Sequence, residues 1–394
     1  MSPPSAASTS PPDDPHAELR AGVRAVCERF PDAYWRELDA GREYPDAFVQ
    51  AMTEAGYLAA LIPQELGGMG LRLDQTSVVL EEINRSGGNA QPAHAQVYTM
   101  GTLLRHGSEE QKREYLPRIA SGELRLQAFA VTKPDAGTDT TQLTTTARRD
   151  GDGYRIDGRK IYISRVEQSD YMVLLARTTP LEQVERRSHG LSVFLVDLRE
   201  AVGRGLTVRP RRVMLNNPTN ELIFDGLQIP ADSLIGEEGE GLRYILDGMN
   251  AERILIAGEC IGNGRWFVDR ATRRAREREV FGRPIGANQG IQFPLARAHV
   301  DVEAADLMRF DAAGRFDRHE RCGAQANMAL VLAADAAWKA ANAALQTFGG
   351  YGVDAEYDVE RKFRETRLFQ VAPISTNLIL AHIGQHVLGL PRSF

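Results

Sequence analysis

The stretch that decides the fold is GLRYILDGMNAERILIAGECIGNGRWFVDRATRRARERE, residues 241–279. It is one helical pattern of unusual length. Glycines lie inside it, and they permit close helix packing because they carry no side chain. Two more long helical patterns follow, residues 290–314 and 322–350, and Ala-rich helices of that length bury most of their faces. The pattern therefore predicts a C-terminal helical bundle.

The residues before this bundle divide into two zones. The first is helical, and Ser108 with Gln111 three residues later has the form of a capping box at a helix start. The second consists of short apolar runs typical of strands, in which Asp157-Gly158 predicts a two-residue hairpin. We therefore expect an α+β multidomain protein: a disordered tail (1–15), an N-terminal helical domain (16–125), a central antiparallel β-barrel or sandwich domain (126–236) and a C-terminal helical bundle (237–394).

The composition limits the possible functions. Hydrophobic residues make up 43% and charged residues 25%, as in ordinary soluble globular proteins, and the net charge of −6 gives no reason to expect a nucleic-acid binder. Cys27, Cys260 and Cys322 are far apart, so we expect no disulfide framework, no metal site and a cytoplasmic location. We also expect no membrane span. The sequence contains no HExxH, GxSxG, Walker A or strand-GxGxxG motif.

Two polar stretches in the strand zone could carry chemistry. In LQAFAVTKPDAGTDTTQLTTTA, residues 126–147, a strand ends in a loop whose freed N–H groups, with Thr132 and Thr138, could bind the polar edge of a planar ligand. A capped turn is the alternative. In RKIYISRVEQSDY, residues 159–171, Tyr162 could lie flat on an aromatic ligand, with Ser164 on the same strand face. A core aromatic is the alternative there.

The third candidate is a pair of segments in the bundle. REREVFGRPIGANQGIQF, residues 276–293, breaks a long helix and carries Arg278, Arg283 and Gln289. LQTFGGYG, residues 345–352, ends a helix in two glycines, where backbone can approach a bulky anionic group closely. Arginine suits a pyrophosphate because its fork donates paired hydrogen bonds. A helix C-cap and a solvated charge run are the alternative.

Together these stretches resemble the acyl-CoA dehydrogenase family of flavoproteins over nearly the whole chain. The set T-x-P-x-A-G-T-D, K-x-Y-I-S, FGRPIGANQGIQF and QTFGGYG occurs in the family's order and spacing. The resemblance implies a C-terminal four-helix bundle, FAD between the β-domain and the bundle, and a homodimer or homotetramer in which one subunit holds part of its neighbour's FAD. The positions that match cofactor contacts are Phe129, Val131, Thr132, Gly137, Thr138, Tyr162, Ser164, Arg278, Phe281, Gln289, Gln346, Gly349, Gly350, Ser375 and Asn377.

The family's reaction removes an α-proton from an acyl thioester while a hydride moves from the β-carbon to flavin N5, which leaves a trans-2-enoyl-CoA. The base is commonly a glutamate near the C-terminus, but Pro373 stands at that position. A subset of the family takes its base from a glutamate that precedes an arginine on the first bundle helix, and Glu252-Arg253 matches that pair. The resemblance therefore implies Glu252 as the base, with a helix-surface salt bridge as the alternative. Asn250 and Arg253 match substrate contacts.

Other residues also differ from the family's usual pattern, and they leave alternative functions open. Tyr162 stands where the family usually has Trp, and Lys133 where it usually has Glu; Lys133 is either a surface exchange or a change in substrate charge preference. Pro373 lacks an N–H that could bind the thioester oxygen, although Ile374 could replace it. The alternatives are a flavin monooxygenase, a dehydrogenase of carrier-protein thioesters, and a non-catalytic FAD and acyl-CoA binder. For the leading function in fatty acid metabolism, the partners would be acyl-CoA and an electron-transfer flavoprotein or another acceptor.

Overall fold

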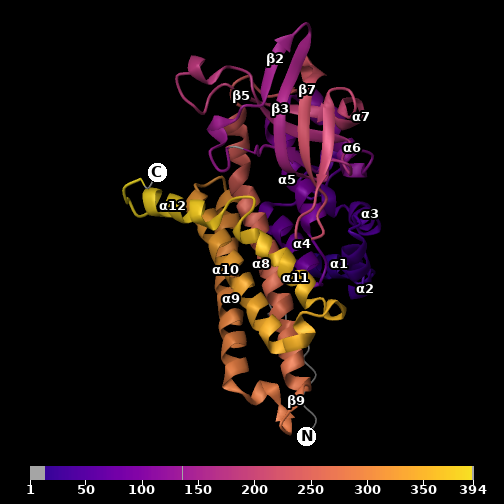
Figure 1. Cartoon of the computed structure of the whole chain (residues 1–394), viewed down its shortest axis with the longest axis vertical. Coiled ribbons are helices and arrows are strands. Elements are labelled where there is room, and N and C mark those ends of the chain that lie inside the picture. The colour runs from indigo at the N-terminus through magenta and orange to yellow at the C-terminus, as the bar shows by residue number, and fades with distance from the viewer. Residues whose placement is uncertain (1–13, 135, 393–394) are drawn as a thin grey trace.

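The structure is a computed structural model that describes residues 14–134 and 136–392, so the predicted tail lies almost wholly outside it. The chain is elongated: the sheet forms one end, the long helices extend to the other, and the N-terminal helices pack beside both (Figure 1). The N-terminal helices are α1 (Ala17–Cys27), α2 (Asp32–Gly41), α3 (Asp46–Glu54), α4 (Leu73–Arg85), α5 (Gln91–His106) and α6 (Glu109–Ser121).

The start of α6 carries the predicted capping box. Gln111 N–H donates to Ser108 Oγ at 3.2 Å, and Ser108 N–H donates to Gln111 Oε1 at 3.0 Å. The Gln111 amide also donates to the carbonyl oxygens of Asp232 (2.7 Å) and Leu234 (2.9 Å), at the end of the sheet domain. The cap therefore both begins a helix and joins two domains.

The central domain is one mixed sheet with strand order β6-β7-β3-β2-β4-β5-β8 and β1 added beside β4. Most neighbours are antiparallel, but β1 pairs with β4 in parallel over three residues and β2 meets β4 in parallel at one. The strands are β1 (Ala128–Ala130), β2 (Thr146–Asp150), β3 (Gly153–Ser164), β4 (Tyr171–Arg177), β5 (Leu191–Asp197), β6 (Leu206–Arg211), β7 (Thr219–Pro230) and β8 (Leu234–Ile235), with the short α7 (Leu198–Ala201) after β5.

The hairpin prediction at Asp157-Gly158 is wrong. Strand β3 runs through these residues, and its register against β7 shifts between Ile156 and Gly158. Asp157 Oδ1 accepts a hydrogen bond from Gly226 N–H at 2.8 Å, so the aspartate belongs to a bulge rather than a turn. The turn between β2 and β3 lies at residues 151–152 instead.

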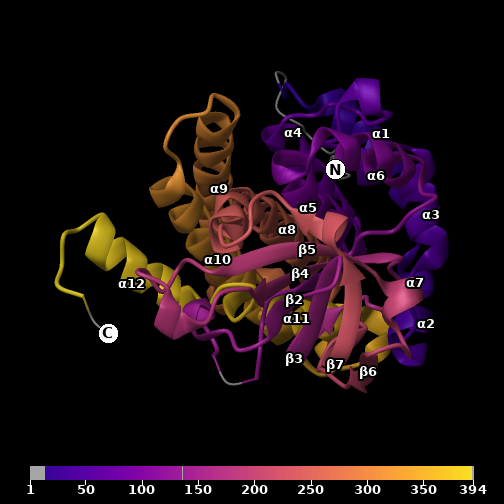
Figure 2. The ribbon, with the colours of Figure 1, turned by 90° about the horizontal axis from the view of Figure 1, so that it is seen from above.

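The C-terminal helices are α8 (Gly241–Glu277), α9 (Gln289–Asp317), α10 (Gly323–Phe348), α11 (Val359–Arg367) and α12 (Thr376–His386), with a small hairpin, β9 (Glu279–Val280) and β10 (Arg283–Pro284), between α8 and α9. The three long helices lie side by side, whereas α12 projects from the body (Figures 1 and 2). By length and composition residues 323–352 could cross a membrane, but half of that apolar window is buried inside the molecule. Helix α10 is apolar because it packs between α8 and the other bundle helices.

Two glycines of the opening stretch set the distance between α8 and α4. A Cβ at Gly258 would lie 2.5 Å from the carbonyl oxygen of Ser77, and a Cβ at Gly262 would lie closer still to that of Glu81. The two helix backbones therefore approach as closely as glycine allows. A buried ionic cluster also joins α4 to α9, because Arg309 Nη2 lies 2.9 Å from Glu81 Oε2 and both side chains are fully buried.

Candidate active site

Glu252 lies in the first third of α8 (Gly241–Glu277). Its exposed fraction is 4%, so it is not the surface residue of the alternative interpretation. Within the described part of the chain it forms no salt bridge. Burial raises the pKa of its carboxyl group to about 7, against the lowering effects of His94, Tyr98 and Arg253. A buried carboxylate of this kind is suited to accept a proton near neutral pH.

Helix α5 supplies the side chains that face Glu252. Burial and, after it, the Glu252 carboxylate raise the pKa of the Tyr98 hydroxyl well above its usual value. One turn earlier, His94 Nδ1 lies 2.7 Å from Glu259 Oε1, seven residues after Glu252 on α8. The His94 pKa is raised: burial opposes its charge, but Glu259 more than compensates. Two acids on α8 thus face two polar rings on α5.

The predicted substrate residues Asn250 and Arg253 lie one turn or less from Glu252, and Asn250 lines a cavity. Arg253 Nη1 donates to Asn250 Oδ1 at 3.0 Å. Asn250 lines a cavity of about 710 Å³, together with Arg321 before α10 and His382 and His386 of α12. This volume is within the range of ligand-binding clefts. The lining is polar and also contains Glu320.

Most of the predicted flavin-binding residues of the sheet domain gather around the ends of β1 and β3. Lys160 Nζ donates to the Val131 carbonyl oxygen at 2.8 Å, and Ile161 N–H donates to that of Thr132 at 3.0 Å. Gly137 and Thr138 lie in the exposed loop that follows. Phe129, in the middle of β1, packs edge-on against Tyr98, with 4.8 Å between the ring centroids. This contact joins β1 to α5.

Tyr162 is 60% exposed, which is unusual for a tyrosine at the end of a strand. Its φ of 60° turns the backbone there, beside a second irregularity in the pairing of β3 with β7. Ser164, two residues on, is fixed by Asn217, whose Nδ2 donates to Ser164 Oγ at 3.0 Å. An exposed aromatic face beside a fixed hydroxyl and an exposed loop fits a planar ring with a polar edge. The residues present therefore fit an isoalloxazine.

Lys133 is not a surface exchange. It is only 8% exposed, and its Nζ donates to Thr144 Oγ1 at 3.3 Å. Its neighbour Lys160 is fully buried, and burial lowers the pKa of Lys160 well below its usual value, with a smaller contribution from Lys133. Two buried lysine side chains therefore lie behind the β1–loop segment, and burial disfavours the charged form of Lys160.

The remaining cofactor residues of the bundle lie at its far end. Arg278 directly follows α8, Phe281 is fully exposed in the β9–β10 hairpin, and Gln289 begins α9. Gln346 and Gly349-Gly350 end α10 beside them, and Arg274 of α8 lies over Tyr351 at 4.5 Å, which joins the two helix ends. Added Cβ atoms at Gly349 and Gly350 would meet nothing within 4 Å, so the space in front of them is open. Arg278 follows Glu252 by 26 residues of helix, roughly 39 Å at 1.5 Å per residue.

The C-terminal segment is not one helix. Helix α11 ends at Arg367, and α12 begins at Thr376. Ser375 is the N-cap of α12, since its Oγ accepts from Leu378 N–H at 3.3 Å, and Asn377 is exposed in the first turn. Pro373 lies in the break, and Ile374 is buried in the core. Within the described residues, Ile374 N–H donates to no protein acceptor.

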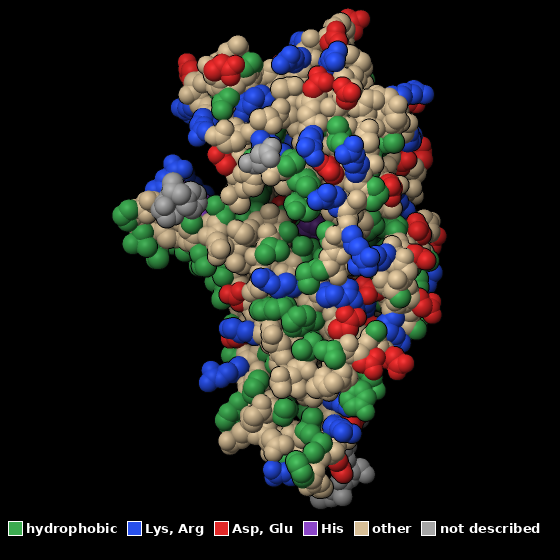
Figure 3. All heavy atoms as spheres, in the orientation of Figure 1, with side chains coloured by type: hydrophobic (Ala, Val, Ile, Leu, Met, Phe, Trp, Pro, Cys, Tyr) green, Lys and Arg blue, Asp and Glu red, His purple; other side chains and the backbone are tan. Residues whose placement is uncertain are grey.

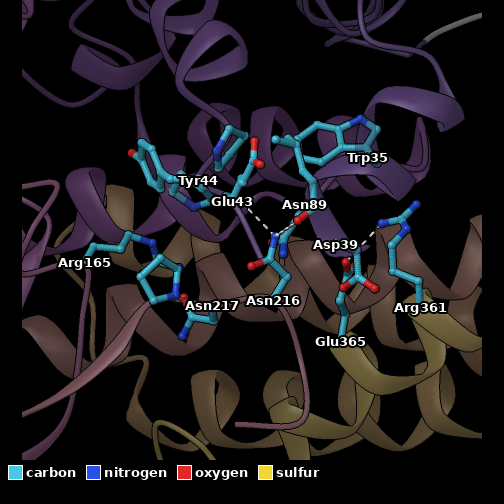
Figure 4. Close-up of a pocket in the computed structure, with 14 residues that line it drawn as sticks. Trp35, Asp39, Glu43, Tyr44, Asn89, Arg165, Asn216, Asn217, Arg361 and Glu365 are labelled. Atoms are coloured by element: carbon cyan, nitrogen blue, oxygen red, sulfur yellow. Dashed lines mark hydrogen bonds and ion pairs between the residues drawn. The ribbon is translucent and has the colours of Figure 1, made fainter. Parts of the chain in front are cut away.

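A second cavity lies where the three parts of the chain meet (Figure 4). Its lining includes Tyr44, Asn89, Arg165, Asn216 and Asn217. Asn216 Nδ2 donates to the carbonyl oxygens of Leu38 and Glu43, which holds the loop before β7 against the N-terminal helices. Its volume of about 20 Å³ suits a water molecule rather than an acyl-CoA.

Reasoning from the sequence missed His94 and Tyr98. The signal was present, because a histidine and a tyrosine four residues apart share one face of the apolar helix QPAHAQVYTMGTLL, residues 91–104. Nothing in the sequence indicates that this face meets Glu252 and Glu259. The basic residues around Asn250, namely Arg321, His382 and His386, were also missed, because three separate segments bring them together.

Comparison with known families agrees with this arrangement. The descriptions "Acyl-CoA dehydrogenase, N-terminal domain", "middle domain" and "C-terminal domain" match residues 13–123, 128–227 and 239–388. Acyl-CoA dehydrogenase FadE12 of Mycobacterium tuberculosis is 34% identical over 381 residues, covering 95% of this chain and 96% of the relative.

Two solved structures have the same fold. One is glutaryl-coenzyme A dehydrogenase in its glutaryl-CoA complex (TM-score 0.89, 29% identity, 98% of each chain covered). The other is butyryl-CoA dehydrogenase of Megasphaera elsdenii (TM-score 0.88, 25% identity, 96% of this chain and 100% of that chain covered).

The fold and the matches define an oxidoreductase of a flavoprotein class, with an N-terminal helical domain, a central sheet domain and a C-terminal helical domain. The chain belongs to the acyl-CoA dehydrogenase family.

Proposed function

We propose that the protein is an FAD-dependent acyl-CoA dehydrogenase in which Glu252 removes the α-proton of the substrate and the product is a trans-2-enoyl-CoA. The observation that carries this proposal is the state of Glu252, which is a carboxylate buried in the protein without an ionic partner. It lies two residues after Asn250, which lines a large cavity. Burial without a cationic partner makes a carboxylate a stronger base. Pro373, at the family's commoner base position, has no acidic group.

The bound flavin would supply the hydride acceptor for the β-carbon, and the residues around β1 and β3 would hold its ring. Asn250 and Arg253 would hold the thioester end of the substrate at the mouth of the cavity. The free N–H of Ile374 supports a donor to the thioester oxygen, where negative charge develops. Such a donor would replace the N–H that Pro373 lacks.

The proposal is tested by identifying the product. The purified flavoprotein is mixed anaerobically with a panel of acyl-CoAs of different length and charge, and flavin absorbance and thioester products are followed together. We expect bleaching with at least one substrate and one enoyl-CoA for each flavin reduced. A hydroxylated product formed with oxygen consumption would indicate the monooxygenase, and reaction only with acyl-carrier protein would indicate the carrier-dependent enzyme.

The rate of flavin reduction should depend on the protonation of Glu252. Only the deprotonated carboxylate can accept the α-proton, and its pKa is raised to about 7. The rate should therefore reach a plateau above that pH and fall about tenfold for each unit below it. Single-turnover measurements over a pH series check this. A rate that stays constant down to the ordinary range of glutamate would contradict the assignment.

We further propose that two or more copies assemble through the long bundle helices. Arg278 lies roughly 39 Å along α8 from Glu252, so the cofactor residues at the far end of the bundle are remote from the site around Glu252 and would serve the FAD of a neighbouring chain. The exposed face of α9 carries Phe293, Val300 and Leu307 at seven-residue spacing, with exposed fractions of 55%, 63% and 76%. Apolar side chains are also visible along the bundle on the face in Figure 3. A second copy of this chain would cover such a stripe.

Leu307→Glu should weaken this self-association, because a buried charge would replace an apolar contact. We expect the oligomer's dissociation constant to rise at least about tenfold, which corresponds to the 1.4 kcal/mol that a lost apolar contact readily exceeds. Light scattering during size-exclusion chromatography over a dilution series measures it. His299→Glu adds the same charge to an exposed position on another side of α9 and should have little effect. Equal dissociation of both variants, or of neither, would contradict this interface.

A further inference from the structure

Arg165 brings a positive charge into the interior without an acid to pair with it. The residue directly follows β3, and its exposed fraction is 6%. Its Nη2 donates to Gln91 Oε1 at 3.2 Å, whereas its Nε is buried and has no hydrogen-bond partner in the described part of the chain. Among the described residues the guanidinium forms no salt bridge. Burial lowers the pKa of Arg165 to about 10, so the group stays charged at neutral pH.

Backbone contacts fix Arg165 beside the candidate flavin site. Its φ of 56° is uncommon for a residue other than glycine. Its N–H donates to the Pro218 carbonyl oxygen at 2.9 Å, and its own carbonyl oxygen accepts from Ser169 Oγ at 2.8 Å. Asn217, next to Pro218, donates to Ser164 Oγ at 3.0 Å. The same short loop therefore positions both the Arg165 backbone and the Ser164 hydroxyl that fits the edge of an isoalloxazine.

The buried carboxylates around Arg165 already have basic partners. Two of them line the same junction cavity as Arg165, and a third, on α8, acts on it electrostatically (Figure 4). The pairs are Asp39 with Arg364 (2.6 Å), Glu365 with Arg361 (3.0 Å) and Glu259 with His94 (2.7 Å). The other acid of the cavity lining, Glu43, is exposed to solvent, which screens its charge. A water molecule in the cavity would solvate Arg165 but would leave its charge in place.

We propose that Arg165 raises the reduction potential of the bound flavin by holding an uncompensated positive charge beside its ring. The inference rests on the proposed function for the place of the flavin at Tyr162 and Ser164. Hydride transfer from the substrate β-carbon adds one negative charge at that place, while the α-proton goes to Glu252. A buried charge without a counter-ion is costly, so Arg165 stabilises a group that becomes negative next to it. Arg165 itself exchanges neither a proton nor an electron.

Arg165→Gln tests this charge directly. The holoenzyme is reduced slowly with dithionite in the presence of a reference dye, so that no acyl-CoA is needed, and flavin and dye absorbance are followed together. We expect the equilibrium constant for two-electron reduction of the flavin to fall about tenfold, which corresponds to about 30 mV. Arg165→Lys keeps the charge and should change this constant by less than about threefold. Arg148→Gln, at an exposed arginine of β2, should leave it unchanged.

Gln91→Glu tests the same charge with the arginine still in place. Glutamate has the shape of glutamine, and its carboxylate would accept from Arg165 where Gln91 Oε1 accepts now. The new ion pair would neutralise the guanidinium, so the equilibrium constant should again fall about tenfold. This variant decides the matter if Arg165→Gln does not fold.

An unchanged equilibrium constant in Gln91→Glu and in a folded Arg165→Gln would overturn the inference. Arg165 would then serve only as a structural link between β3 and α5, and its removal would lower the free energy of unfolding alone. An equal fall in Arg165→Lys and Arg165→Gln would overturn it as well, because the charge would not be the cause. Failure of the proposed function looks different. In that case the constants shift as expected, but no acyl-CoA bleaches the flavin of the wild-type protein.

Discussion

Glu252→Gln is expected to slow flavin reduction by acyl-CoA about 10³-fold while the protein keeps its FAD. Glutamine has the same shape, and burial already favours the neutral form of Glu252, so the amide should fit without disturbing α8. It cannot accept the α-proton. Anaerobic stopped-flow measurement of flavin absorbance gives the rate, and the flavin-to-protein absorbance ratio gives the cofactor content.

Asp269→Asn is the matched control for this variant. It makes the same carboxylate-to-amide change on the same helix, at a side chain that is 64% exposed. Its rate should equal that of wild type within about twofold, since surface substitutions away from the site perturb a protein little. A Glu252→Gln enzyme that reduces its flavin at a rate close to that of this control would show that another group is the base.

The second large effect is on stability. Gly262→Ala should lower the free energy of unfolding by about 2–3 kcal/mol, because its Cβ would overlap the carbonyl oxygen of Glu81 and force α4 away from α8. Separation of these helices would also disturb the buried pair between Glu81 and Arg309. Urea unfolding of the holoprotein, followed by tryptophan fluorescence, measures the change.

Gly290→Ala is the control, and it should change the free energy of unfolding in the opposite direction. Gly290 lies in the first turn of α9, and a Cβ there would meet nothing within 4 Å. Alanine should therefore stabilise the helix by up to about 1 kcal/mol, through its higher helix propensity and the lower entropy of the unfolded chain. If both alanine variants stabilised the protein, close α4–α8 packing at Gly262 would not be a constraint.

Where the signals are local, the sequence predicts much of this fold. The long helical pattern of residues 241–279 corresponds to α8, its glycines predict close helix contact, and Ser108 with Gln111 marks the start of α6. The hairpin prediction failed because Asp157-Gly158 is a local signal, whereas pairing of β3 with β7 is decided by residues some 65 positions away. In the same way, no local pattern indicates that Lys133 is buried beside Lys160.

In the candidate site, too, the sequence indicates what depends on local patterns and misses what depends on contacts between distant residues. Glu252 is proposed as the base because it stands beside Arg253 in a pattern that resembles a subset of the family. Tyr98 and His94 could not be assigned a role, because their meaning depends on α5 meeting α8 across about 150 residues of chain. The roles of Arg321, His382 and His386 likewise depend on where α12 lies relative to α10, which no helical pattern specifies.

Deuterium exchange at the substrate α-carbon tests the central claim most directly. Holoenzyme and an acyl-CoA that bleaches the flavin are incubated anaerobically in D₂O, and recovered thioester is analysed by mass spectrometry for deuterium at C2. The account predicts exchange with wild type and Asp269→Asn, and none above background with Glu252→Gln. Exchange by Glu252→Gln at the wild-type rate would contradict it, because another group would then be removing the α-proton.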